Sequence, residues 1–392
     1  KGFLYNWHLN LFRSNRFSER IQREIRRTLE RDGARLKDYP SWFGTLINTE
    51  TGSGNSFPTD EERTAFFDAQ VEKALGFAVP ATNLFKFGTS HNPALCRFSD
   101  SERTALLPGN VYPETPRSVQ MMNLWCERES FNWRINGLIA DQLREYRPDV
   151  VFWTDPVCST GQFAKMDVAS DWSYSIDPYE FLSGFRDSLG RLADPEKPFY
   201  ATLGMDYVRP EWRKIVLPDG TKATLQVTAD DAIQQTWLAM SQLQTRGITY
   251  WYLTGWLEGF EKARGHYADP GNDAKLGRVI RDEIVPCGTL LAEASIKKPS
   301  IALLRPKETS YLMAGEGKMH WGVWHYTKAW GLFLTRLGIP YDIVSEETLT
   351  PGKLAEYKTV LFFMGGYISK RIDGELKSAA ARGTRIIVDD YC

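Results

Sequence analysis

The sequence is poor in cysteine and has no excess of either charge. Its cysteines are widely spaced, at Cys96, Cys126, Cys158, Cys287 and Cys392, and none forms the Cys-x-x-Cys pair of zinc or thioredoxin-type sites. Lys and Arg number 48 against 49 Asp and Glu, so the net charge is -1. This balance gives no electrostatic basis for binding nucleic acid or an anionic membrane. We therefore expect no metal, no nucleic-acid partner and no membrane partner.

Long hydrophobic runs are also lacking. No apolar stretch reaches the roughly 20 residues that a membrane-spanning helix needs. The sequence begins Lys1-Gly2-Phe3-Leu4-Tyr5, which contains no initiator methionine and does not resemble a signal peptide, so we expect the true N-terminus to lie elsewhere. Localisation therefore stays unknown. Nothing suggests an organic cofactor, because Gly365-Gly366 lacks the Gly-x-Gly-x-x-Gly pattern of dinucleotide sites.

Aromatic residues, in contrast, are abundant, with 13 Trp, 17 Tyr and 21 Phe. They are equally compatible with large cores and with platforms on which sugar rings stack. A length of 392 residues is sufficient for one large domain and part of a second. The choice between these roles therefore depends on the motifs.

An apolar run from Trp42 to Ile47 ends in a polar tip, Asn48-Thr49-Glu50, and glycines follow at 52 and 54. A buried strand that ends in a carboxylate at a loop is how a barrel presents an acid to a substrate. The same pattern also suits a structural carboxylate that caps a neighbouring loop. Glu50 is therefore a catalytic candidate with a structural alternative.

The sequence of strand, polar end and helix recurs along the chain. Further strands are predicted at 150–153, 171–179, 197–205 and 247–256, and helices at 18–37, 118–146, 179–192 and 229–246. Strands that alternate with helices predict a parallel α/β sheet, and polar strand ends on one face predict a (β/α)8 TIM-type barrel. Only about five of the eight units fit before residue 256, so we expect the first units to be absent from the chain.

From Lys298 onward the pattern changes to short strands at 300–304, 341–344, 359–364 and 384–388, with helices at 321–337 and 369–382. This pattern predicts a doubly wound parallel α/β domain. We therefore divide the chain into a partial barrel at 1–297 and a partial second domain at 298–392.

These units resemble glycoside hydrolase family 42 and its β-galactosidase relatives, which are retaining TIM-barrel enzymes. The run Ile47-Asn48-Thr49-Glu50-Thr51-Gly52 is similar to their fourth-strand Ile-(Asp/Glu)-Asn-Glu-Tyr-Gly, 147–151 to the fifth strand, 172–179 to the sixth and 247–251 to the eighth. The resemblance implies that Glu50 is the general acid/base and that no cofactor is needed. It also implies that 298–392 is an amidotransferase-like trimerisation domain, and hence a homo-oligomer such as a trimer.

Two positions depart from the family pattern. Thr49 stands where the family has an asparagine that contacts the sugar 2-hydroxyl. The family's seventh strand reads Lys-Pro-Phe-Trp-Leu-Met-Glu, and its nucleophile position falls on Leu203, which carries no carboxyl group. The identity of the second catalytic carboxyl is therefore in doubt.

Asp206 is the nearest substitute on this strand, and we predict it as the nucleophile or base. Asp155 and Asp177 are other partners for Glu50, and Asp206 could equally hold the loop that contains Arg209 and Arg213. A retaining reaction needs carboxyls about 5 Å apart and an inverting one about 6.5–9.5 Å. The stereochemistry therefore stays open.

Polar and aromatic residues near the strand ends are predicted to bind substrate. Aromatic rings there would stack on sugars if they point inward, or pack against the helices if they point outward. The predicted substrate-binding residues are Asn48, Thr49, Trp153, Asp155, Trp172, Asp177, Trp251 and Trp256.

The sequence thus predicts a β-galactosidase-like glycoside hydrolase that cleaves O-glycosidic bonds of an oligo- or polysaccharide. One alternative is a non-catalytic carbohydrate-binding relative, which Leu203 favours. Another is a structural subunit in which the barrel serves as scaffold.

Overall fold

The computed structural model describes part of the chain. The described residues are 3–7, 19–47, 111–112, 134–153, 166–173, 175, 177–190, 197–204, 214–216, 218–224, 228–242, 245–251, 271–294, 297–306, 320–346, 349–365 and 368–389.

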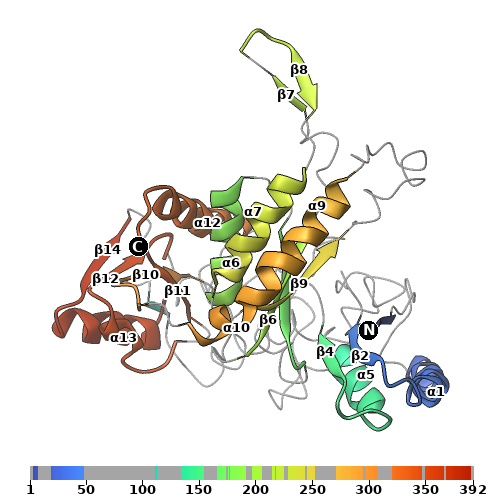
Figure 1. Cartoon of the computed structure of the whole chain (residues 1–392). Helices are drawn as coiled ribbons and strands as arrows, with labels where there is room; N and C mark the ends of the chain where they lie inside the picture. The colour runs from blue at the N-terminus through green and yellow to red at the C-terminus, as the bar shows by residue number, and fades with distance from the viewer. Residues whose placement is uncertain are drawn as a thin grey trace.

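In the first part of the chain, parallel strands follow one another in space in the order of the sequence (Figure 1). The strands are β1 (Phe3–Trp7), β2 (Trp42–Ile47), β4 (Val151–Trp153), β5 (Ala169–Ser173), β6 (Phe199–Gly204) and β9 (Thr245–Trp251). A parallel bridge between Trp153 and Val168 joins β4 to the chain just before β5. Residues 3–7, which the sequence suggests only as the tail of a strand leading into a loop, form β1 and pair in parallel with β2.

Helices follow most of these strands in the sequence. They are α1 (Glu19–Leu36), α5 (Arg134–Arg144), α6 (Pro178–Gly190), α7 (Ala229–Met240), α9 (Asn272–Val279) and α10 (Val285–Glu293), the last two joined by a π-helical turn at Ile280–Ile284. The prediction of α1 is confirmed, since Ile21, Ile25 and Leu29 are buried at helical spacing. Among the described helices, none combines the length and the hydropathy needed to cross a bilayer.

A single apolar core lies between these helices and one face of the strands. It includes Ile25 of α1, Phe152 of β4, Phe181 of α6 and Phe199 of β6, each with at most 1% of its surface exposed. Burying a side chain of this size stabilises the fold by about 1.5–3 kcal/mol. This layer of buried rings and aliphatic chains fixes which face of each strand the helices cover.

Two predicted boundaries are wrong, and local capping explains the first. The strand expected at 171–179 runs instead from Ala169 to Ser173, because Asp177 accepts hydrogen bonds from the backbone N–H groups of Tyr179 and Glu180 and so starts α6 at Pro178. The helix expected at 229–246 ends at Met240, and β9 begins already at Thr245.

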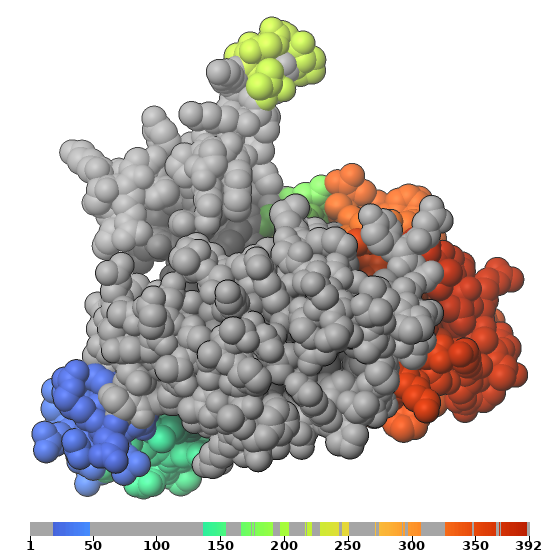
Figure 2. Space-filling model, turned by 180° about the vertical axis from the view of Figure 1, so that it is seen from behind, coloured from blue at the N-terminus to red at the C-terminus, as the bar shows by residue number. Residues whose placement is uncertain are grey.

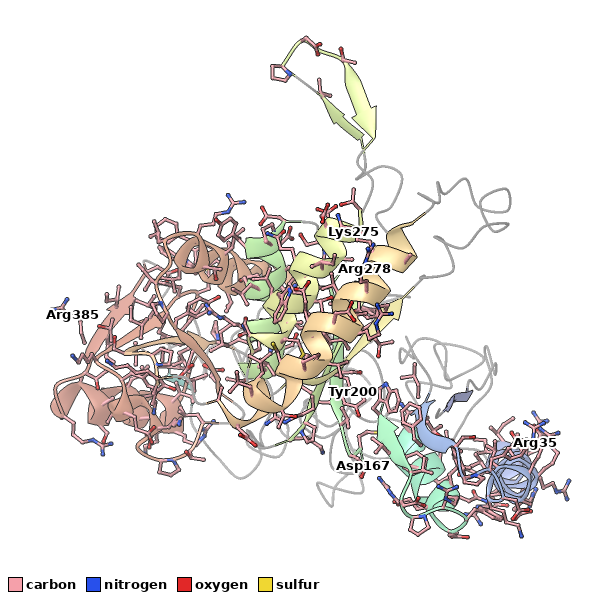
Figure 3. All side chains as sticks on the ribbon, in the orientation of Figure 1. Arg35, Asp167, Tyr200, Lys275, Arg278 and Arg385 are labelled. Carbon is pink, nitrogen blue, oxygen red and sulfur yellow. The ribbon has the colours of Figure 1, made fainter. Side chains whose placement is uncertain are left out.

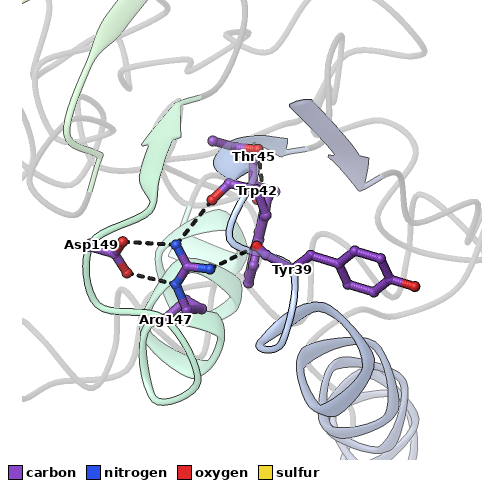
Figure 4. Close-up of polar contacts among 6 residues, drawn as sticks. Tyr39, Trp42, Thr45, Arg147 and Asp149 are labelled. Atoms are coloured by element: carbon purple, nitrogen blue, oxygen red, sulfur yellow. Dashed lines mark hydrogen bonds and ion pairs between the residues drawn. The ribbon is translucent and has the colours of Figure 1, made fainter. Parts of the chain in front are cut away.

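Arg147 joins the start of β4 to the turn between α1 and β2 (Figure 4). Its guanidinium donates to the backbone carbonyls of Tyr39 at 2.9 Å and Trp42 at 3.3 Å, and forms two 2.8 Å hydrogen bonds with the carboxylate of Asp149. The Trp42 indole N–H donates in turn to Thr45 Oγ1 at 3.0 Å. The Arg147 guanidinium thus connects the start of β4 to the turn between α1 and β2, which lie more than 100 residues apart in sequence.

The second part of the chain is a parallel sheet with helices on both faces, which confirms the predicted elements. The sheet order is β11 (Asp342–Ser345), β10 (Ile301–Arg305), β12 (Thr359–Phe362) and β14 (Arg385–Val388). Leu303 and Leu361 pack against α12 (His320–Arg336), whereas the alternate residues Leu304 and Phe362 pack against α13 (Lys370–Ala381). Short elements complete this part, a 3-10 turn at Lys353–Glu356 and the paired strands β3 (Val111–Tyr112) and β13 (Ile368–Ser369).

A hairpin of β7 (Lys214–Val216) and β8 (Lys222–Thr224) lies between β6 and α7 in the sequence. Figure 2 shows it standing away from the other described elements. Its turn contains Gly220 at φ 81°, and Asp219 accepts a hydrogen bond from the Thr221 backbone N–H at 2.9 Å. The Pro-Asp-Gly run is a recognised turn signal, although the hairpin was not predicted from it.

Candidate active site

The register of the strands separates residues that face the helices from residues that face the opposite, inner side. Phe199, Ala201 and Leu203 of β6 lie in the core beneath the helices. Tyr200 and Thr202 alternate with them and therefore face inward. We use the term inner face for this side of the strands, where Leu46, Trp153 and Val168 also cluster with Tyr200.

An aromatic pair lies on the inner face. The rings of Trp153 and Tyr200 meet edge to face, with centroids 5.3 Å apart. A Cβ at Gly44 would lie 2.6 Å from the Trp153 indole, and one at Gly247 would lie 2.7 Å from the Tyr200 ring. Both rings therefore lie directly on the backbone of a strand that has no side chain there. Trp153 is only 3% exposed, so its predicted stacking on sugar stays a prediction beside an observed role in packing.

Tyr200 is the polar member of this pair. Figure 3 shows it on the side of β6 that faces β4. Burial raises the pKa of its phenol above the usual value, so the hydroxyl stays protonated near neutral pH and can donate a hydrogen bond. Its strand neighbour Ser170 is fully buried on the same face. We did not predict Tyr200, although strict alternation along 199–203 would have placed it inward.

Trp172 lies one step farther toward the carboxyl end of the sheet. It pairs with Thr202 in the β5–β6 register, and therefore shares the inner face with it. Thr202 is 2% exposed, whereas Trp172 is only half-buried. Trp172 is thus a predicted sugar-binding ring that the structure places inward and partly accessible.

Leu203 does not occupy an inner-face position. Its side chain is fully buried in the core beneath the helices, and its register partners Ser173 and Tyr250 lie on that same side. A carboxyl group at this position would point at helices rather than at a substrate. The strand orientation therefore removes the argument that a catalytic carboxylate has been lost at Leu203.

Comparisons with known proteins give structural matches only, since no family model and no curated protein matches the sequence. The β-galactosidase from Rahnella sp. R3 superposes with a TM-score of 0.60 at 14% identity, over 95% of this chain and 55% of that one. The β-galactosidase from Bacillus circulans sp. alkalophilus gives 0.59 at 15% identity, with the same coverage. Gan42B, a GH42 β-galactosidase, gives 0.53 at 14% identity, again with 95% and 55% coverage.

The chain resembles the GH42 β-galactosidases in fold. At these identities the likeness concerns the fold alone, and the chain spans just over half the length of these structures. The resemblance to GH42 β-galactosidases that the short strand motifs predicted is confirmed at the level of the fold.

Asp177 serves as a helix cap and an ion-pair partner. One carboxylate oxygen accepts hydrogen bonds from Tyr179 and Glu180, and the other lies 2.7 Å from the Arg336 guanidinium of α12. Burial favours the neutral carboxyl, but the hydrogen bonds from Glu180 and Tyr179 together with Arg336 outweigh it and lower the pKa of Asp177. Both oxygens are thus engaged, and substrate binding by Asp177 stays a prediction.

Most other predicted site residues lie outside the described residues. Trp251 is described only as the last backbone position of β9. In the described ranges, no group of three or more His, Cys, Asp or Glu could hold a metal ion. The predicted residues outside those ranges are the catalytic pair Glu50 and Asp206 and the binding residues Asn48, Thr49, Asp155 and Trp256.

Proposed function

We propose that this chain is a glycoside hydrolase that cleaves O-glycosidic bonds of a β-galactoside-like substrate. The observation that carries the proposal is the shared direction of β2 and β6. β2 belongs to the parallel sheet β1-β2-β4 and β6 to the parallel sheet β5-β6-β9. A parallel bridge between Trp153 and Val168 links the two sheets, so the carboxyl ends of β2 and β6 point the same way. Glu50 follows the end of β2 by three residues and Asp206 the end of β6 by two.

Sequence spacing supports the same pair. Glu50 comes four residues after Leu46 of β2, and Asp206 comes four residues after Thr202 of β6. Side chains an even number of positions apart in a strand share a face, and Leu46 and Thr202 both face inward. In the proposed reaction Glu50 protonates the glycosidic oxygen as general acid. Asp206 attacks the anomeric carbon or activates a water molecule, depending on whether the carboxyls are about 5 Å or about 6.5–9.5 Å apart.

The proposed architecture is a partial (β/α)8 barrel at 1–297 followed by an amidotransferase-like unit at 298–392 that assembles a homo-oligomer. The sequential order of the parallel strands and the GH42-type neighbours support the barrel. A half-buried Trp172 on the inner face supports a carbohydrate ligand, since indole rings stack on apolar sugar faces.

Hydrolysis of aryl β-galactosides by the wild-type chain and by Glu50→Gln tests this function. We expect Glu50→Gln to lower kcat by at least about 100-fold, because general acid catalysis typically contributes that much. Glu30→Gln changes an exposed carboxyl of α1 and serves as the matched control. Equal activity of Glu50→Gln and wild type would refute the assignment, and glycan binding without any hydrolysis would favour the non-catalytic alternative.

A further inference from the structure

Helix α6 belongs to the first part of the chain but packs against the second. Figure 1 shows it between α7 and α12. A Cβ at Gly190 would lie 2.6 Å from the Ile343 side chain of β11, and one at Gly331 of α12 would lie 2.8 Å from Ser183 Oγ. Ser183 Oγ also donates to the backbone carbonyl of Lys328 at 3.3 Å. Backbone and side chain thus meet without any space between them.

Charged contacts run along the same interface. The carboxylate of Asp187, which is fully buried, lies 3.7 Å from the guanidinium of Arg305 at the end of β10. The guanidinium of Arg186 lies 5.0 Å from the centre of the Tyr341 ring. Arg336 binds Asp177 at the first turn of α6, so the second part of the chain contacts this helix near both ends.

The first turn of α6 lies just after the carboxyl end of β5, the strand that carries Trp172. The segment between them is held from a second side as well, because buried Gln235 of α7 donates its amide N–H to the Ser175 carbonyl at 2.9 Å. Two residues shortly after Trp172 are therefore held from different helices, Ser175 by α7 and Asp177 by α12.

We propose that Arg336 is a positioning residue that makes the second part of the chain hold the end of β5, and with it Trp172, in place for substrate. This inference rests on the proposed glycosidase function. It gives 298–392 a role within each protomer, in addition to the proposed role in assembly. Within the described ranges, Arg336 contacts the start of α6 through the Asp177 carboxylate at 2.7 Å and the Tyr179 ring, whose centre lies 6.0 Å from the guanidinium.

Hydrogen exchange of the full chain, read by mass spectrometry over residues 169–190, tests the proposal without requiring activity. In Arg336→Met we expect exchange in this segment to rise about two- to fivefold, the effect of losing one partly exposed ion pair. Arg281→Met is the matched control, since Arg281 forms an equally short 2.7 Å pair with Asp282 at a more exposed site. Unchanged exchange in Arg336→Met, or an equal rise in the control, would overturn the proposal.

Asp177→Asn keeps the helix cap and removes the charge, so it should reproduce the effect of Arg336→Met, and the double variant should add little. In the active enzyme we expect kcat/KM to fall by a similar factor through KM, since Trp172 is proposed to bind the sugar. Exchange that rises with unchanged kinetic constants would refute positioning for catalysis. A wild-type chain without hydrolytic activity would instead refute the proposed function and leave the exchange result standing.

Discussion

Replacing Leu203 with glutamate tests whether this position is a vacant nucleophile site or part of the core. The side chain is fully buried beneath the helices, and removing it from this core forfeits about 1.5–3 kcal/mol of burial. Keeping a buried glutamate neutral at pH 7 costs about 4 kcal/mol more, since each pKa unit above 4.3 is worth about 1.4 kcal/mol. The total is comparable to the whole stability of many domains.

We therefore expect Leu203→Glu to be largely unfolded at pH 7 and to gain no hydrolytic activity. Urea unfolding followed by circular dichroism measures the stability, and aryl galactoside hydrolysis measures the activity. Leu203→Met conserves volume and should cost less than about 1.5 kcal/mol. A Leu203→Glu variant with wild-type stability, or with increased hydrolysis, would show that residue 203 faces the substrate and that our orientation of β6 is wrong.

Two further perturbations test contacts that hold the fold. Asp177→Ala should cost about 1–2 kcal/mol because it removes both the α6 cap and the pair with Arg336, whereas Asp177→Asn should cost less than about 1 kcal/mol. The pKa of Asp177 is lowered in the fold, so the stabilisation from its ionised carboxylate is complete above the unfolded-state pKa and is lost as pH falls through the folded-state pKa. In urea titrations between pH 7 and pH 3, the free energies of unfolding of the two variants should therefore approach that of wild type. Arg147→Met should lower the free energy of unfolding measured in urea, because two backbone carbonyls lose a charged donor, whereas Asp149→Asn should leave it nearly unchanged. Equal losses in both variants would place the effect in the exposed ion pair instead.

Regular patterns made much of the fold predictable. The helical spacing of Ile21, Ile25 and Leu29 located α1, and the short apolar runs from Ile301 onward located the strands of the second sheet. In these segments local propensity and tertiary packing agree, so that pattern and structure coincide. Residues 3–7 were predicted only as the tail of a strand, because their aromatic and polar residues do not alternate clearly. Pairing with β2 is what defines β1.

The face of the sheet on which a side chain lies was harder to predict than the presence of the strand. In β2 the register shifts opposite Phe3 and Leu4, and Trp42 consequently lies in the core beneath the helices, with its indole bonded to Thr45. A bulge of this kind reverses the alternation, which a short sequence window does not reveal. The facing of Leu203 was equally unpredictable, since a family pattern gives a residue number but not the face of the strand.

Long-range partners of the site were not predictable at all. Asp177 and Arg336 are separated by 159 positions, and each reads locally as an ordinary solvated charge. Only the packing of α6 on α12 brings them together. The catalytic roles of Glu50 and Asp206 stay predictions, because both residues lie outside the described ranges.

The glycines beneath the two inner rings have an evolutionary consequence. Gly44 and Gly247 leave the space that Trp153 and Tyr200 occupy, so glycine and ring at each place share one fixed volume. A homologue with a side chain in place of either glycine would need a smaller residue in place of the ring that faces it. These positions should therefore covary as large-small couples, and a double exchange such as Tyr200→Ser with Gly247→Val should be tolerated better than Gly247→Val alone.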